Sequence, residues 1–172
     1  MKKIGLLIFA FVLALYSCNQ KDEKNRERIR FTREWKFTLD NADQYSTPGF
    51  DDADWRVLNL PHDWSIEGNF SKEHPASPGG GALPGGIGWY RKSFKLPETD
   101  KDKLVFIDFD GIYQKGEVWI NGHRLGMRPN GYSSFRYELT SHLNFGEEEN
   151  VLAVKVDNSE QPNSRWYSGS GI

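Results

Sequence analysis

The chain has 172 residues and a formal net charge of −2, so its length fits one domain of ordinary size. Its charged residues are spread along the whole chain, and we therefore expect no nucleic acid as a partner. Aromatic residues make up 14% of the sequence, with six Trp and eleven Phe, which is enough to bury a core. The 17 Gly and 8 Pro follow no fixed period, which excludes a collagen-like or repeat architecture.

The first segment of the chain has the pattern of an export signal. Lys2 and Lys3 are followed by a nearly unbroken apolar run of 13 residues, Ile4 to Tyr16. That run is long enough for the apolar region of a signal peptide and short for a membrane span. We therefore predict that residues 1–17 are a signal peptide and form no part of the folded domain.

The single cysteine of the chain follows this segment directly. Ser17 gives a small residue before Cys18, and this arrangement resembles the signal of bacterial lipoproteins, in which the cysteine is lipidated. Residues 18–28 would then be the lipidated cysteine and a polar tether, anchored in the membrane of the cell envelope. The orientation, periplasmic or at the cell surface, stays open. The alternative is an ordinary signal peptide cut nearby, with an incidental Cys18.

From residue 29 onward, short strand-like runs alternate with turn residues. Residues 35–39 and 135–139 alternate apolar with polar side chains, the pattern of a half-buried strand. Residues 104–109 are nearly all apolar, which predicts a strand buried on both faces. Asn121-Gly122 is typical of a tight hairpin turn. Further strands are expected near 88–96, 118–120 and 151–156, and a single helical turn near 140–143.

This pattern of strands predicts an all-β domain over residues 29–172, a β-sandwich or jelly roll. Two stretches, 48–68 and 71–88, are expected to be long loops, and loops of this length in a compact domain are functional or disordered.

The six tryptophans are divided by their surroundings in the sequence. Trp35 and Trp119 lie within strand-like runs, and we assign them to the core. Trp64, Trp89, Trp166 and the neighbouring Tyr167 border loops, which favours a role at the surface or between domains, since such rings stack on sugars.

No group of residues in the chain has the spacing of a catalytic or metal site. Asp51, Asp52 and Asp54 are interpreted as solvated surface charge with a turn cap. His62-Asp63 has the residue types of a general base with its orienting carboxylate, but no Ser or Cys nucleophile is tied to it, and we favour a structural loop. The four histidines lack metal-ligand spacing. We expect no catalytic residue, metal or cofactor in this chain.

A series of short motifs nevertheless occurs in a specific order. The series reads LPHDW at 60–64, PGGIGWYRK at 84–92, DG at 110–111, VWINGH at 118–123, GYSSF at 131–135, NVLAVKVDN at 150–158 and WYSGSGI at 166–172. It resembles the N-terminal jelly-roll, or galactose-binding-like, sugar-binding domain of family 2 glycoside hydrolases, closest to the β-galactosidase branch. The resemblance covers residues 31–172.

The resemblance implies a retaining glycosidase of carbohydrate metabolism that hydrolyses terminal β-linked sugars with two glutamates. In the family those glutamates lie on a TIM barrel that follows an immunoglobulin-like domain. The chain would stop before both, would be inactive alone, and would have the downstream barrel and a β-galactoside or related glycan as partners. Mannoside and glucuronide remain open as substrates. The alternative function is a non-catalytic carbohydrate-binding surface lipoprotein.

The resemblance also implies roles for particular residues. An Asp at the end of the last strand binds sugar hydroxyls in family β-galactosidases, and Asp157 matches that position. Trp166 matches a loop near the active-site entrance and is expected to support it. Some members carry a substrate-binding Asn where this chain has Gly85 or Gly86, so that contact is not carried over.

Overall fold

The computed structural model describes residues 26–74, 82–160 and 169–172. Cys18, Trp166 and Tyr167 lie outside this part, so their predicted roles stay predictions. The chain divides into two units, Met1–Phe31 and Thr32–Ile172. All the strands belong to the second unit. Among the described residues, no helix is long and apolar enough to cross a membrane.

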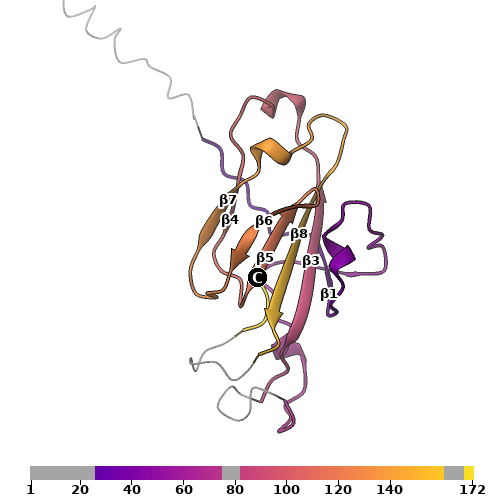
Figure 1. Ribbon diagram of the computed structural model, residues 1–172, viewed down its shortest axis with the longest axis vertical. Coiled ribbons are helices and arrows are strands. Elements are labelled where there is room, and N and C mark those ends of the chain that lie inside the picture. Colours follow the sequence, from indigo (N-terminus) through magenta and orange to yellow (C-terminus); the bar gives the residue numbers. More distant parts are fainter. Residues whose placement is uncertain (1–25, 75–81, 161–168) are drawn as a thin grey trace, which may run out of the picture. The chain divides into compact units, whose positions relative to one another are not determined.

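The second unit is a sandwich of two antiparallel sheets (Figure 1), which confirms the all-β prediction. The larger sheet has the strand order β2-β1-β3-β8-β5-β6, and the smaller pairs β4 with β7. The strands are β1 (Trp35–Thr38), β2 (Arg56–Leu58), β3 (Gly86–Phe94), β4 (Phe106–Phe109), β5 (Gly116–Ile120), β6 (His123–Arg128), β7 (Phe135–Glu138) and β8 (Asn150–Asn158). Short 3-10 turns lie at η1 (Asp43–Ser46), η2 (Ser65–Glu67), η4 (Glu98–Asp100) and η5 (Thr140–His142).

Local sequence patterns account for the elements that were predicted. Trp35 and Phe37 of β1 are buried while Lys36 and Thr38 are half-buried, as alternation requires. The β5–β6 hairpin turns at Asn121 and Gly122, whose φ angles are 49° and 81°. Both values suit Asn and Gly better than other residues.

The larger part of the core lies on one face of the larger sheet, and a smaller buried cluster of Tyr45, Trp89 and Ala153 lies on the other. Tyr90 of β3 and Val118 of β5 are completely buried on the first face, and alternate residues of the central strand β8 join them. These are Leu152, Val154, Val156 and Asn158. Phe109 of the smaller sheet is buried as well, at 4% exposure. Burial of this apolar surface is the main stabilising contribution expected for a domain of this size.

Two groups of predictions about burial were wrong. Residues 104–109 do not form a strand buried on both faces, because β4 belongs to a two-stranded sheet with one outer face. Leu104 is 71% and Phe106 43% exposed. Trp64 and Trp89, assigned to a surface role, are 4% and 1% exposed. Trp64 stacks on Phe37, and Trp89 lies within β3 and packs against Tyr45 and Trp119.

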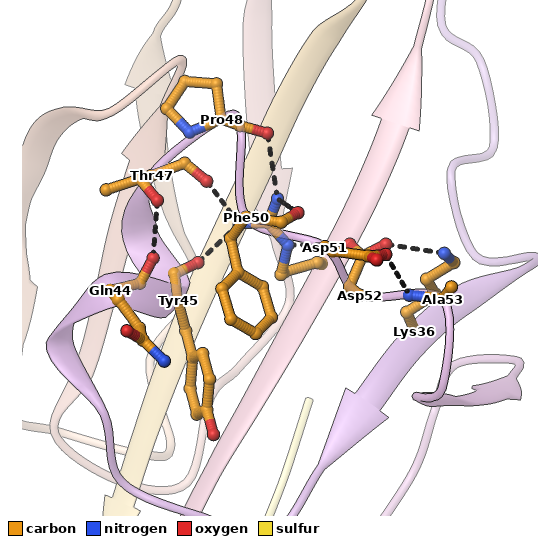
Figure 2. Close-up of polar contacts among 10 residues, drawn as sticks. Lys36, Gln44, Tyr45, Thr47, Pro48, Phe50, Asp51, Asp52 and Ala53 are labelled. Carbon is orange, nitrogen blue, oxygen red and sulfur yellow. Dashed lines mark hydrogen bonds and ion pairs between the residues drawn. The ribbon is translucent and has the colours of Figure 1, made fainter.

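Arg91 fixes the loop that covers the other face of the larger sheet. It is 1% exposed, and its Nε donates to Asp52 Oδ2 at 2.7 Å. Its two terminal nitrogens donate to carbonyl oxygens of the same loop, which are drawn in Figure 2. These acceptors are Tyr45, Thr47, Pro48 and Phe50. One guanidinium group therefore binds several carbonyls of the loop at once, of which the bond to Tyr45 is buried and the others are partly buried.

Asp52 completes this anchor. The prediction that Asp52 is a solvated surface charge was therefore wrong. Asp52 accepts a second hydrogen bond, from Lys36 Nζ at 2.6 Å. Burial acts to raise the pKa of Asp52, but the bonds from Lys36 and Arg91 hold it below its ordinary value. Asp51, by contrast, is exposed and caps a turn through the amide of Ala53, as predicted.

A second anchor holds the loop before β3 against the core face. His62 Nδ1 and the Tyr90 hydroxyl are 2.7 Å apart, and His62 Nε2 lies 2.7 Å from Arg56 Nη2. Because arginine can only donate, Nε2 accepts, and Nδ1–H donates to Tyr90. The neutral imidazole is the form that fits. Arg56 also pairs with Glu67 at 2.8 Å.

Replacing the buried guanidinium tests the first anchor. Arg91→Met should lower the free energy of unfolding by about 3 kcal/mol or more, because Asp52 and several carbonyls lose their buried partner. Urea denaturation of the chain measures this. The matched control is Arg124→Met, since Arg124 pairs with Glu117 at the surface and exposed pairs contribute about 0–1 kcal/mol. Similar small losses in both variants would contradict the anchoring role.

The His62 anchor predicts a dependence of stability on pH. Burial is the largest cause that lowers the pKa of His62 below its ordinary 6.5, against the opposing charge of Glu67. Below pH 6.5 the unfolded chain therefore binds more protons than the folded domain, so stability is present above that pH and falls as pH decreases.

Denaturation midpoints at pH 7.0, 6.0 and 5.0 should show a smaller fall in His62→Gln than in the unaltered chain. His74→Gln serves as the control and should keep the full fall, because His74 lies in a separate loop contact with Asn69. An unchanged pH slope in His62→Gln would show that another group causes it.

Candidate functional site

Asp157 lies near the C-terminal end of β8, an interior strand of the larger sheet. It pairs with Ile87 of β3, and its amide donates to the carbonyl of Gln114 at 3.0 Å. The side chain is half-buried. It shares a sheet face with Lys155 and Ile87, because alternate residues of a strand and directly paired residues point to the same side. Asp157 therefore points away from the face that carries Tyr90, to the side on which Ile87 packs against a second buried cluster.

The carboxylate of Asp157 is held from one side only among the described residues. Its Oδ1 accepts from the amide of Ser159 at 3.0 Å and from the Ser159 hydroxyl at 2.6 Å. Within the described part of the chain, no arginine or lysine forms an ion pair with it. Lys115 is near enough that the charge of Asp157 adds to a raised pKa, whose first cause is the hydrogen bond to Glu160. No residue of the described ranges donates a hydrogen bond to Oδ2.

The next residue, Asn158, points inward and fastens a different segment. It is 1% exposed, and its Nδ2 donates to the carbonyl of Gly169 at 2.8 Å and to Ser170 Oγ at 2.7 Å. Gln114 Nε2 approaches its Oδ1 at 3.4 Å. Asn158 therefore connects the end of β8 with residues 169–172.

Residues 169–172 are bridged to two loops that are distant in the sequence. Gly171 pairs with Asp63 and with Tyr113, and Ser170 N donates to Asp63 Oδ1 at 2.9 Å. Gly171 has a φ of 153°, and a Cβ there would lie 1.9 Å from the His62 carbonyl oxygen. Glycine is required by both its backbone angle and this close approach.

The His62-Asp63 pair serves these contacts rather than a nucleophile. Asp63 Oδ1 accepts from Ser170 and from the amide of Ser65, while His62 contacts Tyr90. The structural interpretation of the pair fits this geometry. The described residues also contain no cluster of three or more His, Cys, Asp or Glu that could hold a metal.

Sequence reasoning singled out Asp157 but missed the groups that orient it. Ser159 and Gln114 bond Asp157, and Asn158 anchors the strand end on which it sits. The signal for Ser159 was present, because an Asp followed two residues later by Ser is typical of a side-chain turn. Gln114 had no such signal, since it is brought to β8 by the pairing of β5.

Residues 88–167 match the family of glycosyl hydrolase 2 galactose-binding-like domains. Over 147 residues the chain is 60% identical to the β-galactosidase BoGH2A of Bacteroides ovatus, covering 86% of this chain and 17% of that protein. It is 40% identical over 134 residues to a β-glucuronidase of Formosa agariphila, covering 77% of this chain and 14% of that protein. The chain therefore spans about a sixth of the length of these relatives.

Solved structures give the same result. A β-glycosidase of Bacteroides vulgatus superposes with a TM-score of 0.81 at 51% identity, over 85% of this chain and 19% of that chain. A family 2 glycosyl hydrolase of Bacteroides cellulosilyticus gives a TM-score of 0.79 at 38% identity, over 84% and 19%. Residues 32–172 are therefore an N-terminal galactose-binding-like domain of glycoside hydrolase family 2.

Proposed function

We propose that this domain supports substrate binding in a β-galactosidase-type hydrolase that removes terminal β-linked sugars. The support is its 60% identity to a β-galactosidase. The chain matches 17% of that relative's length, so the groups that cleave the glycosidic bond would lie in another part of the polypeptide. In this proposal the 172-residue chain contributes no proton donor or nucleophile and is inactive alone.

Asp157 is the residue proposed to bind the sugar, and the observation that carries the proposal is that no described residue donates to its Oδ2. Ser159 holds Oδ1, which leaves Oδ2 to accept a hydrogen bond from a sugar hydroxyl. A bond to a charged oxygen is stronger than one between neutral groups. Because the carboxylate is already oriented by Ser159, substrate binding would restrict little further motion of it.

The sugar is proposed to be galactose, with glucuronic acid as the competing assignment. The relatives named above include enzymes of both kinds. The carboxylate of Asp157 would repel the carboxylate of a glucuronide at short range, and it would accept from the uncharged hydroxyls of a galactoside. This difference favours a galactoside wherever Asp157 contacts the sugar.

The test is Asp157→Asn in the complete polypeptide that carries this domain. Loss of one charge-assisted hydrogen bond should weaken binding by about 1.5–3 kcal/mol, or about ten- to a hundred-fold. Steady-state kinetics on a panel of aryl β-glycosides measures this as a fall in kcat/KM for the galactoside, with the melting temperature unchanged.

Asp54→Asn is the matched control, because Asp54 is exposed and lies in the segment between η1 and β2. It should leave kcat/KM unaltered. Full activity of Asp157→Asn on every glycoside of the panel would remove Asp157 from the substrate site. If the unaltered polypeptide prefers a glucuronide, the proposed sugar is glucuronic acid and not galactose.

Attachment to the cell envelope is a second part of the proposal. It is supported by the apolar run Ile4 to Tyr16 and by Cys18, which is the one cysteine of the sequence. A diacylglyceryl group on Cys18 together with a further acyl chain would give stable anchoring. The domain would then act on glycans next to a membrane.

Cys18→Ala tests this anchoring. The substitution removes the thiol that would carry the lipid, so the protein should move from the membrane fraction to a soluble fraction after cell lysis. Cys18→Ser is the control that keeps side-chain size and should behave like Cys18→Ala. Unchanged membrane association of both variants would show that lipid on this residue does not anchor the chain.

A further inference from the structure

An arginine-rich segment precedes the first strand, and its arginine side chains take no part in the contacts described above. Arg26, Arg28, Arg30 and Arg33 fall within eight residues, and Glu27 is the single acidic residue among them. This arginine segment, residues 26–33, therefore has a net charge of +3. The whole chain carries −2, so the remainder is net negative and the positive charge is concentrated here.

The guanidinium groups of this segment face solvent. Residues 26–30 are all exposed and have no regular secondary structure. Within residues 26–74, 82–160 and 169–172, no carboxylate forms an ion pair with Arg26, Arg28 or Arg30. Ile29 between them is 70% exposed. These side chains are thus available to a ligand, and none is needed to hold the domain together.

The spacing of the arginines suits a flat anionic surface. Arg26, Arg28 and Arg30 occupy alternate positions, and alternate side chains of an extended chain point to the same side. All three guanidinium groups can therefore meet one surface at once. Guanidinium groups pair with phosphate oxygens through two parallel hydrogen bonds.

The position of the segment favours a membrane as that surface. On its C-terminal side the fold begins at once, because the Thr32 carbonyl accepts from Leu60 N at 2.7 Å and Glu34 N donates to Asn59 at 3.0 Å. On the N-terminal side, the apolar run ends at Tyr16. The ten residues to Arg26 span at most about 35 Å when fully extended.

We propose that the arginine segment binds the phosphate groups of anionic phospholipids in the membrane that holds the N-terminal end of the chain. The inference uses the membrane attachment proposed above and is independent of the hydrolytic activity. Near an anionic bilayer, each arginine strengthens association by about five-fold at moderate salt. Three arginines together would hold the start of the domain at the lipid surface.

The test uses the full chain in vesicles of phosphatidylcholine alone or with phosphatidylglycerol added. A glutamate-specific protease cuts after Glu27, inside the segment, and mass spectrometry gives the rate of that cut. On the anionic vesicles the cut should be at least about ten-fold slower, and about 0.5 M salt should abolish the difference by screening. If the chain is attached to both vesicle types and the cut after Glu27 is equally fast on each, the proposal is overturned.

Matched variants assign the protection to the arginines. A triple variant with Arg26→Gln, Arg28→Gln and Arg30→Gln keeps the cleavage site and should lose the difference between vesicles. A control with Lys72→Gln, Lys95→Gln and Lys101→Gln makes the same change in charge at exposed positions elsewhere and should retain it. Protection that persists in the arginine variant would overturn the proposal.

Two further outcomes separate this inference from the membrane attachment on which it draws. Flotation of the chain with anionic vesicles alone would support arginine binding and contradict an independent anchor. Flotation with neither vesicle type would overturn both. Equal or stronger protection by a soluble sulfated polysaccharide would assign the segment to acidic glycans and overturn the lipid proposal.

Discussion

The pairing of β3 with β8 is the constraint on which the rest of the domain depends. It joins nine residue pairs, from Gly86 with Asn158 to Phe94 with Asn150, and β8 pairs on its other side with β5. The strand nearest the end of the chain is therefore an interior strand of the sheet. Loops from both halves of the sequence can reach the same sheet edge only because this ladder brings residues 86–94 and 150–158 together.

Neighbouring residues of these two strands perform opposite tasks because strand side chains alternate between faces. On β3, Tyr90 contacts His62 on the core side, while Arg91 binds the loop that covers the opposite side. On β8, Asn158 fastens residues 169–172 inside, while Asp157 remains on the outer side. A shift of the register by one residue would exchange these tasks and bury the carboxylate.

The sequence predicted the features that local chemistry determines. Alternation in β1, the Asn121-Gly122 turn and the all-β class each depend on residues close together in the chain, and the structure confirmed them. The two partners of Asp52, by contrast, are brought to it by pairing of β1 with β3, so no local pattern could mark it as an ion-pair residue. Trp89 was misassigned for the same reason: it stacks on Trp119 at 5.1 Å, a contact between β3 and β5. Strand β2 has only three residues, and β6 has no regular alternation, so neither was predicted.

The candidate site follows the same division between local and distant determinants. The turn from Asp157 to Ser159 is local, so the sequence contains the reason that one carboxylate oxygen is occupied. The direction in which the carboxylate points is not local, because it requires Asn158 to take the inward position and Gln114 to hold the Asp157 amide. Each of those partners reaches β8 through sheet pairing or through the bridge at Gly171. An aspartate at a strand end is common in β domains. Here these distant contacts hold it half-buried and oriented, with Oδ2 uncontacted by any described residue, which are the properties that a sugar-binding carboxylate needs.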